Sequence, residues 1–292
     1  MSIRANACSE SSELRTYEYL DSARFDKKII AMNILDKIIT DKKREVELKK
    51  NIIPVSQLEA SVLFNSRTYS MSKLLRNSVS GIIAEHKRRS PSKLVINNNH
   101  SVEDVVLGYQ NAGVCGISVL TDGKYFGGSL DDLLLAKASV NVPLLRKEFI
   151  FDEYQILEAK AHGADVILLI AAVLTREEIK KLSEFAQSLA LEVLLEVHNL
   201  EELEKSIMPS LDMIGVNNRN LKTFEVSLDY SKQLATKIPD EFVKVSESGI
   251  SSVEAVKELQ PFGFQGFLMG EHFMKTENPG LEAKRFITNL IF

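Results

Sequence analysis

The chain has 292 residues, of which 45% are hydrophobic, so it can bury the core of one large α/β domain or two smaller ones. Its 36 basic and 40 acidic side chains give a net charge of −4, which argues against a nucleic-acid-binding protein. The apolar runs are strand-sized, and Cys8 and Cys115 suit neither a disulfide framework nor a metal cluster, so we expect a cytoplasmic protein without a membrane segment.

Residues 1–31 differ from the rest of the chain, because they are rich in Ser and charge and lack the apolar stretch of a secretory signal. Met32 opens a segment over 33–50 whose apolar residues have helical spacing, and a weaker helical pattern covers 70–79. We therefore predict that 1–31 are an N-terminal extension, disordered or foreign to the functional protein. Residues 32–292 are predicted to form a single domain.

From residue 81 onward, short apolar runs alternate with segments of helical periodicity. The apolar runs lie near 81–87, 115–121, 143–149, 165–173, 192–198, 213–219, 242–248 and 265–270. The helical segments cover 101–113, 129–140, 152–163, 175–190, 199–208, 227–237, 252–260 and 279–291. Four of them are preceded by a capping residue with an acidic residue three positions later, namely Ser101, Thr175, Asn199 and Ser251.

Eight strand–helix pairs in series indicate a parallel sheet. Eight pairs in roughly 210 residues match a closed (β/α)₈ TIM barrel, which typically needs about 250 residues. The competing architecture, an open doubly wound sheet, usually has a Gly-rich phosphate loop after its first strand, but residues 87–92 contain no glycine. We therefore predict a barrel over 81–292, preceded by an extra N-terminal helical segment over 32–80.

Charged and amide side chains stand at the ends of five predicted strands. They are Glu85 and Lys87, Lys147, Glu196, Asn217 and Arg219, and Glu247. Residues two apart on a strand share a face, and barrel active sites lie at the C-terminal strand ends, so these groups should converge in one cavity. A structural ion-pair network is the alternative, although buried ion pairs seldom add net stability over apolar packing. The pattern favours proton transfer, with lysine pKa values lowered by neighbouring cations and glutamate pKa values raised by burial.

The loops after the last two strands contain Ser248, Gly249 and Gly270, where barrels often bind a phosphate. Either glycine alone is also explained by a tight turn. Ser90 begins a long connection that is either a solvated loop or a mobile flap. No two histidines have the helical spacing of metal ligands, so we expect no metal, and His198 is expected at the polar rim of the cavity.

Several strings resemble the signatures of one known family, indole-3-glycerol-phosphate synthase. AEHKRRSPSK at 84–93 is similar to its strand-one signature. The later segments follow in that family's order: LLRKEFI (144–150), LLEVH (194–198), GVNNRNL (215–221), VSESGI (245–250) and GFLMGE (266–271). MNILDKII at 32–39 resembles its usual N-terminus, so the resemblance covers about residues 32–292.

The resemblance implies a step of tryptophan biosynthesis that uses no cofactor or metal. The implied substrate is 1-(2-carboxyphenylamino)-1-deoxyribulose 5-phosphate, which undergoes ring closure, decarboxylation and dehydration to indole-3-glycerol phosphate. By the same resemblance, Lys147 protonates the substrate ketone, Glu196 stabilises the cationic intermediate, and Lys87 and Glu85 share the acid and base roles of dehydration. The other implied site residues are Asn217, Arg219, Glu247 and Ser90 for substrate positioning, and Ser248, Gly249, Gly270 and Glu271 for the phosphate.

The expected partner is a small sugar-phosphate substrate rather than nucleic acid or a membrane. We expect a monomer, or a loose complex with other tryptophan-pathway enzymes. Two alternatives stay open. One is another phosphate-binding barrel enzyme of the phosphoribosylanthranilate isomerase type. A resemblance to that family would imply a Cys/Asp acid–base pair on the strands, whereas strand one here ends in Glu85 and Lys87. The other is an inactive barrel acting as a binding subunit, against which the intact set of Lys147, Glu196 and Lys87 argues.

Overall fold

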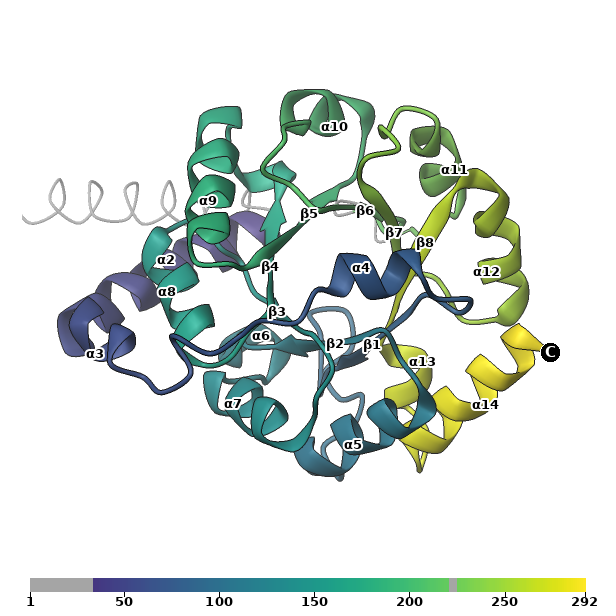
Figure 1. The fold of residues 1–292 in the computed structure, drawn as a ribbon, viewed down its shortest axis with the longest axis horizontal. Coiled ribbons are helices and arrows are strands. Elements are labelled where there is room, and N and C mark those ends of the chain that lie inside the picture. The colour runs from purple at the N-terminus through teal and green to yellow at the C-terminus, as the bar shows by residue number, and fades with distance from the viewer. Residues whose placement is uncertain (1–33, 221–224) are drawn as a thin grey trace, which may run out of the picture. The chain divides into compact units, whose positions relative to one another are not determined.

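Eight parallel strands form a closed ring in chain order, with the last strand paired back to the first (Figure 1). This computed structural model describes residues 34–220 and 225–292, and it confirms the predicted (β/α)₈ barrel. The strands are β1 Ile82–His86, β2 Gly116–Leu120, β3 Leu144–Lys147, β4 Val166–Ile170, β5 Glu192–Val197, β6 Met213–Asn217, β7 Val243–Glu247 and β8 Phe264–Met269. Each overlaps an apolar run predicted from the sequence.

A helix follows each strand and packs on the outside of the ring (Figure 1). These helices are α5 Val102–Ala112, α7 Leu130–Ser139, α8 Glu153–Ala161, α9 Arg176–Ser188, α10 Leu200–Ser206, α11 Asp229–Ala235, α12 Val253–Leu259 and α14 Pro279–Ile291. Shorter elements lie between them: α6 Gly123–Phe126, α13 Glu271–Met274, and the 3₁₀ turns η1 Ala171–Val173 and η2 Gln260–Phe262. The barrel is preceded by α2 Ile34–Ile52, α3 Val55–Glu59 and α4 Met71–Arg76.

The chain divides into two compact units between Arg44 and Glu45, within α2. The barrel belongs entirely to the unit that begins at Glu45, and the site described below lies in that unit. The extension predicted over 1–31 lies outside the described residues.

Local capping signals set the starts of the outer helices. Thr175 forms a complete capping box, and the caps predicted at Ser101 and Asn199 are confirmed. The cap predicted at Ser251 is wrong. The hydroxyl of Ser252 instead accepts a hydrogen bond from the backbone N–H of Ala255 in the first turn of α12. Neighbouring serines offer the same chemistry, so sequence spacing fixes such a boundary only to within a residue or two.

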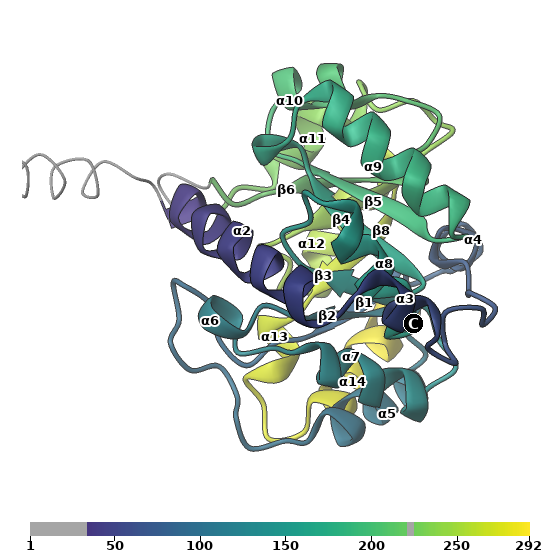
Figure 2. The same ribbon diagram turned by 90° about the vertical axis from the view of Figure 1, so that its left-hand side faces the viewer.

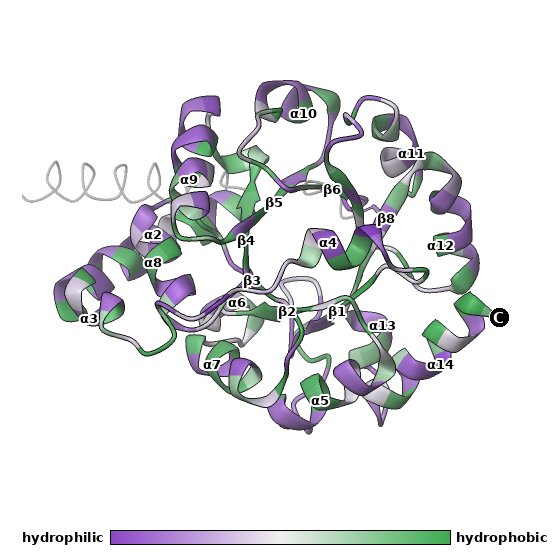
Figure 3. Cartoon of the chain, in the orientation of Figure 1, coloured by the Kyte–Doolittle hydropathy of each residue, from purple (hydrophilic) through white to green (hydrophobic). Residues whose placement is uncertain are grey.

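The interior of the ring is apolar at the end where the strands begin. Helix α4 contacts β7 and β8 there and inserts Met71 and Leu75, both fully buried, among the inward side chains of the strands. The Glu192 carboxylate fixes α4 by accepting the backbone N–H groups of Met71 at 2.8 Å and Ser72 at 3.0 Å. Figure 2 shows α4 and α6 at opposite ends of the barrel, and Figure 3 shows hydrophobic residues along the strands. This plug leaves the C-terminal ends of the strands for polar chemistry.

The seam between β1 and β8 is covered by α5 and α14, which approach closely at two glycines. A Cβ at Gly280 would lie 2.5 Å from the Cα of Gly108, and a Cβ at Gly108 would lie 2.9 Å from the Cα of Gly280. Because both contacts are with backbone atoms, neither helix can accept a side chain here without moving. The two glycines therefore set the distance between the helices that close the barrel.

We expect Gly280→Ala to lower the free energy of unfolding by about 1–3 kcal/mol, since a methyl group would separate α5 from α14 despite the higher helix propensity of alanine. Urea unfolding of the purified variant measures the effect. Lys284→Ala on the exposed side of α14 is the control and should change stability by no more than about 0.5 kcal/mol. Equal stability of Gly280→Ala and the control would show that the helices tolerate a wider spacing.

Candidate active site

Lys147 lies at the centre of a buried ion-pair cluster at the C-terminal ends of the strands. It ends β3, and its Nζ donates to Oε2 of Glu196 on β5 at 3.0 Å. The same ammonium donates to Oε2 of Glu247, the last residue of β7, in a shorter contact. The side chains are 15%, 6% and 2% exposed respectively, so water contributes little to stabilising their charges.

The excess of carboxylates over nearby cations determines where protons reside in this cluster. Burial by itself lowers the pKa of Lys147, but the negative charges of Glu247, Glu196 and Glu85 outweigh it and raise that pKa above its ordinary value. The expected lowering of lysine pKa values by neighbouring cations is therefore wrong for Lys147, because the groups facing it are carboxylates. Lys147 is protonated throughout the neutral range.

The two carboxylates that bind Lys147 have opposite pKa shifts. Burial opposes the ionisation of Glu196, but Lys147, His198 and Asn217 outweigh it and lower the pKa to about 2. For Glu247, burial together with the nearby charges of Glu196 and Glu85 exceeds the effect of Lys147 and raises the pKa to about 7. Glu196 is thus the permanent anion, and Glu247 is the carboxyl that gains or loses a proton near neutral pH.

A second ion pair lies at the end of β1, between Glu85 on the strand and Lys87 just after it. Glu85 lies inside the barrel mouth, where its Oε1 is 2.7 Å from Nζ of Lys87 and its Oε2 accepts the Ser118 hydroxyl at 3.1 Å. Burial raises the pKa of Glu85, but the positive charges of Lys87 and Lys147 more than offset it, so the net shift is downward. The alternation of side chains along a strand thus brings Glu85 and Lys87 together as predicted.

Asn217 and His198 both contact the Glu196 oxygen that Lys147 leaves free. The Asn217 amide donates to Oε1 of Glu196 at 3.1 Å, and its own oxygen accepts the backbone N–H of Arg219 at 3.0 Å. Nε2 of His198 lies 3.3 Å from the same Oε1. His198 was predicted at the rim, yet only 9% of its side chain is exposed. Its position two residues after Glu196, on the same face, is the signal that could have placed it.

Two glycines leave room for the carboxylates. A Cβ at Gly215 would lie 2.2 Å from Oε1 of Glu247, and a Cβ at Gly270 would lie 2.8 Å from Oε1 of Glu85. Gly215 is on β6 beside Glu247 on β7, and Gly270 follows β8, which pairs with the strand of Glu85. Any side chain at either position would displace an acidic group, so both glycines belong to the architecture of the cluster.

The loops predicted to surround a phosphate leave the sheet side by side. Glu247 pairs with Leu268 across β7 and β8, so the turn after β7 and the start of α13 emerge from adjacent strands. Ser248 and Gly249 have φ values of +64° and +77°, and Gly270 is the N-cap of α13. A left-handed conformation is unusual for serine, and strain of this kind often marks a functional turn.

A buried amide supports this turn. Asn218 donates to the Ser246 hydroxyl at 2.8 Å and to the Ser248 carbonyl at 3.1 Å, while its own oxygen accepts the Ser231 hydroxyl at 2.8 Å. Sequence reasoning assigned Asn217 and Arg219 but missed Asn218, which faces the helix layer. An asparagine that alternates with site residues on a strand is a recognisable signal for such a support.

The remaining predicted residues lie on the loop after β1 and at the start of α13. Ser90 pairs with Lys93 through both backbone hydrogen bonds, at 2.8 and 3.0 Å. Nζ of Lys93 in turn binds Oε1 of Glu271 at 2.7 Å, which joins this loop to α13. The structure does not bring Ser90 into hydrogen-bond or ion-pair contact with the described residues around Lys147.

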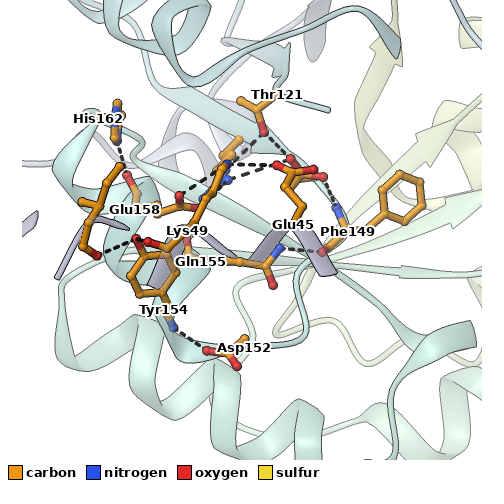
Figure 4. Close-up of polar contacts among 12 residues, drawn as sticks. Glu45, Lys49, Thr121, Phe149, Asp152, Tyr154, Gln155, Glu158 and His162 are labelled. Atoms are coloured by element: carbon orange, nitrogen blue, oxygen red, sulfur yellow. Dashed lines mark hydrogen bonds and ion pairs between the residues drawn. The ribbon is translucent and has the colours of Figure 1, made fainter. Parts of the chain in front are cut away.

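A buried polar network lies behind Lys147, on the outer face of β3 (Figure 4). Nη2 of Arg146 is 3.1 Å from Oε2 of Glu158 on α8, and its Nε donates to the Thr121 hydroxyl at 3.2 Å. Thr121 donates to Oε2 of Glu148 at 2.9 Å. Arg146 and Glu148 flank Lys147 and point away from the barrel interior, so this network fixes the strand end that presents the lysine.

Residues 34–220 and 225–292 contain no group of three or more His, Cys, Asp or Glu side chains that could hold a metal ion. Over the same residues, no helix combines the length and the apolar composition needed to cross a bilayer.

Barrel active sites lie at the C-terminal face, and a lysine beside carboxylates there is a set of groups that can move protons on a small substrate, so the fold and site define a barrel enzyme. The model of the indole-3-glycerol phosphate synthase family matches residues 35–286. A Bacteroides thetaiotaomicron protein of that description is 49% identical over 87% of this chain and 98% of its own length. An Aliarcobacter butzleri protein of the same description is 41% identical over 88% and 99%. The chain belongs to the indole-3-glycerol phosphate synthase family and is a carboxy-lyase of tryptophan biosynthesis.

Solved structures with little sequence similarity share the fold alone. The 3-hexulose-6-phosphate synthase of Salmonella typhimurium superposes with a TM-score of 0.56 at 12% identity, over 72% of this chain and 98% of that one. With the family established, no observation favours the isomerase or the inactive barrel that the sequence left open.

The raised pKa of Glu247 generates a prediction for stability. Its protonated form is favoured in the folded state, so it stabilises the fold fully below the unfolded value near 4.5, and this contribution is lost as pH rises through about 7. Between pH 5 and 7, wild-type stability should therefore fall by about 1–3 kcal/mol more than that of Glu247→Gln. Urea unfolding across this range measures the difference, with exposed Glu204→Gln on α10 as control. Parallel curves for wild type and Glu247→Gln would refute the assignment.

Proposed function

We propose that the cluster around Lys147 catalyses the ring closure, decarboxylation and dehydration of 1-(2-carboxyphenylamino)-1-deoxyribulose 5-phosphate. The observation that carries this proposal is the buried Lys147 ammonium held in contact with the carboxylates of Glu196 and Glu247. Forming a carbon–carbon bond to a ketone needs a proton donor at the ketone oxygen, and the cationic intermediate that results needs a nearby anion. Lys147 and Glu196, which are in hydrogen-bond contact at the barrel mouth, supply these two groups.

In the first step, the aryl carbon that bears the carboxylate forms a bond to the ketone carbon. The electrons of the carbonyl π bond move to its oxygen, which takes a proton from Lys147. The developing alkoxide is more basic than an amine, so it can accept the proton despite the raised pKa of this lysine. Glu196 stays ionised and stabilises the positive charge now shared by the ring and the nitrogen. Loss of carbon dioxide returns its bonding electrons to the ring and restores aromaticity.

The second half of the reaction removes water, and we assign it to the pair at the end of β1. Lys87 and Glu85 are in contact, so an acid that protonates the leaving hydroxyl and a base that accepts a proton are held in one place. Either residue can be the acid in this arrangement, with the other as the base. The hydroxyl departs as water, and loss of a proton from the adjacent carbon completes the indole.

We assign substrate binding to the residues that the family resemblance indicates. Asn217, Arg219, Glu247 and Ser90 position the substrate, and Ser248, Gly249, Gly270 and Glu271 surround its phosphate, the last three through backbone N–H groups. The left-handed turn at Ser248 and Gly249, beside the start of α13, supports this assignment. Phosphate at this position would place the sugar chain across the mouth towards Lys147.

The proposal extends to the whole chain. Residues 1–31 are an extension ahead of a functional unit over 32–292, and the family match beginning at residue 35 supports this division. The protein acts in the cytoplasm, as a monomer or in a loose complex with other enzymes of its pathway, and its net charge of −4 disfavours nucleic acid as a partner.

Lys147→Arg tests the proton-donor role with little loss of charge pairing. The guanidinium stays protonated in proteins, so we expect kcat to fall at least ~10²-fold while the melting temperature stays near that of wild type. Fluorescence detection of indole-3-glycerol phosphate from the synthetic substrate, with a chelator present, measures the rate. Lys147→Ala should lose the same activity and in addition about 3–5 kcal/mol of stability, because Glu196 and Glu247 lose their cation.

Lys181→Arg on the exposed side of α9 is the matched control and should keep normal turnover. If Lys147→Arg also turned over near the wild-type rate, Lys147 would be an electrostatic group only, and the proposed proton transfer would have to come from elsewhere.

A further inference from the structure

His198 stands between two carboxylates, and the geometry of its ring defines its charge. Nδ1 lies 3.1 Å from Oε2 of Glu202 on α10, and Nε2 lies 3.3 Å from Oε1 of Glu196. Nδ1 must carry a hydrogen to meet the Glu202 oxygen. A neutral ring with that tautomer would then present the lone pair of Nε2 to an ionised carboxylate, which is repulsive. The imidazolium is the form of the ring whose charge is attracted to both carboxylates.

Glu202 is itself held in place. Its Oε2 also accepts the backbone N–H of His198 at 2.8 Å, and its Oε1 accepts the Asn199 amide at 2.8 Å. Asn199 caps the helix α10 that carries Glu202. The first turn of α10 therefore holds the Nδ1 side of the imidazole, and Nε2 on the other side lies 3.3 Å from Glu196. Among the described residues, Nε2 has no partner in hydrogen-bonding geometry, so its contact with Glu196 is electrostatic.

We propose that His198 is a positioning residue that acts as the second cation of Glu196, the first being Lys147. This inference rests on the proposed function of Glu196. When Lys147 gives its proton to the substrate, it becomes neutral and Glu196 loses that partner. The imidazolium of His198 remains and keeps Glu196 ionised and oriented while the cationic intermediate exists. Without it, Glu196 would have Asn217 as its other donor and would more readily take up a proton.

The charged groups that act on His198 make the proposal dependent on pH. They are Glu196 on β5, Glu202 on α10 and Glu247 on β7. Burial lowers the pKa of His198, but these carboxylates together raise it above 6.5. The charged ring therefore persists to higher pH than in an ordinary imidazole, and the charge is lost as pH rises through this raised value.

The test compares His198→Gln with wild type across pH, because glutamine can still donate a hydrogen bond but has no charge. At pH 6.5 we expect His198→Gln to lower kcat about tenfold with a smaller effect on KM, and the ratio of rates should shrink towards one by pH 9.5. Glu202→Gln should lower kcat in the same direction. His162→Gln, at the end of α8 that leads into β4, is the control and should leave kcat unchanged. A pH-independent ratio, or unchanged kcat in His198→Gln, would overturn the proposal.

A double-mutant cycle separates this inference from the proposed function. Glu196→Gln alone tests the role of Glu196, and unchanged kcat in that variant would refute the proposed function itself. If Glu196→Gln lowers kcat, adding His198→Gln should change it less than about twofold, because His198 acts through Glu196. A full tenfold further loss would reject the His198 inference and leave the role of Glu196 intact. Independently, an NMR titration of the imidazole, assigned with His198→Gln, should give a pKa above 6.5, and a value at or below 6.5 would contradict the proposal.

Discussion

The site depends on one ammonium group that is shared by two buried carboxylates. Lys147 donates to both Glu196 and Glu247 where the barrel interior offers little water, and its charge offsets part of the cost of burying their ionised forms. Because one lysine cannot neutralise two acids, their pKa values separate, to about 2 and about 7. The same contact therefore supplies a permanent anion, a protonatable carboxyl and a proton donor within one hydrogen-bonded group.

The closed sheet makes this arrangement possible. Lys147, Glu196 and Glu247 come from alternate strands, β3, β5 and β7, whose side chains meet at the mouth of a parallel barrel. The backbone also makes room for the acids, since Gly215 and Gly270 stand where any side chain would strike Glu247 or Glu85. The plug formed by α4 at the other end confines the polar chemistry to one face. The closed sheet, the two glycines and α4 together therefore determine where the site residues lie.

Much of this could be predicted from the sequence, because periodicity and strand-end residues are local signals. All eight strands overlap predicted runs, and the alternation expected from β1 into the residue after it correctly placed Glu85 and Lys87 on one side. Four-residue helices such as α6 are too short to show a periodicity, so they were missed. The direction of the Lys147 pKa shift was also missed. Spacing tells which side chains share a face, whereas the pKa depends on which charges from other strands lie closest.

The ionisation of the cluster is the central claim, and neutron diffraction from deuterated crystals of the ligand-free protein near pH 6 tests it most directly. The account predicts three deuterons on Nζ of Lys147, one on the Glu247 carboxyl and none on Glu196. A neutral amine on Lys147, or a deuteron on Glu196 with Glu247 ionised, would contradict it.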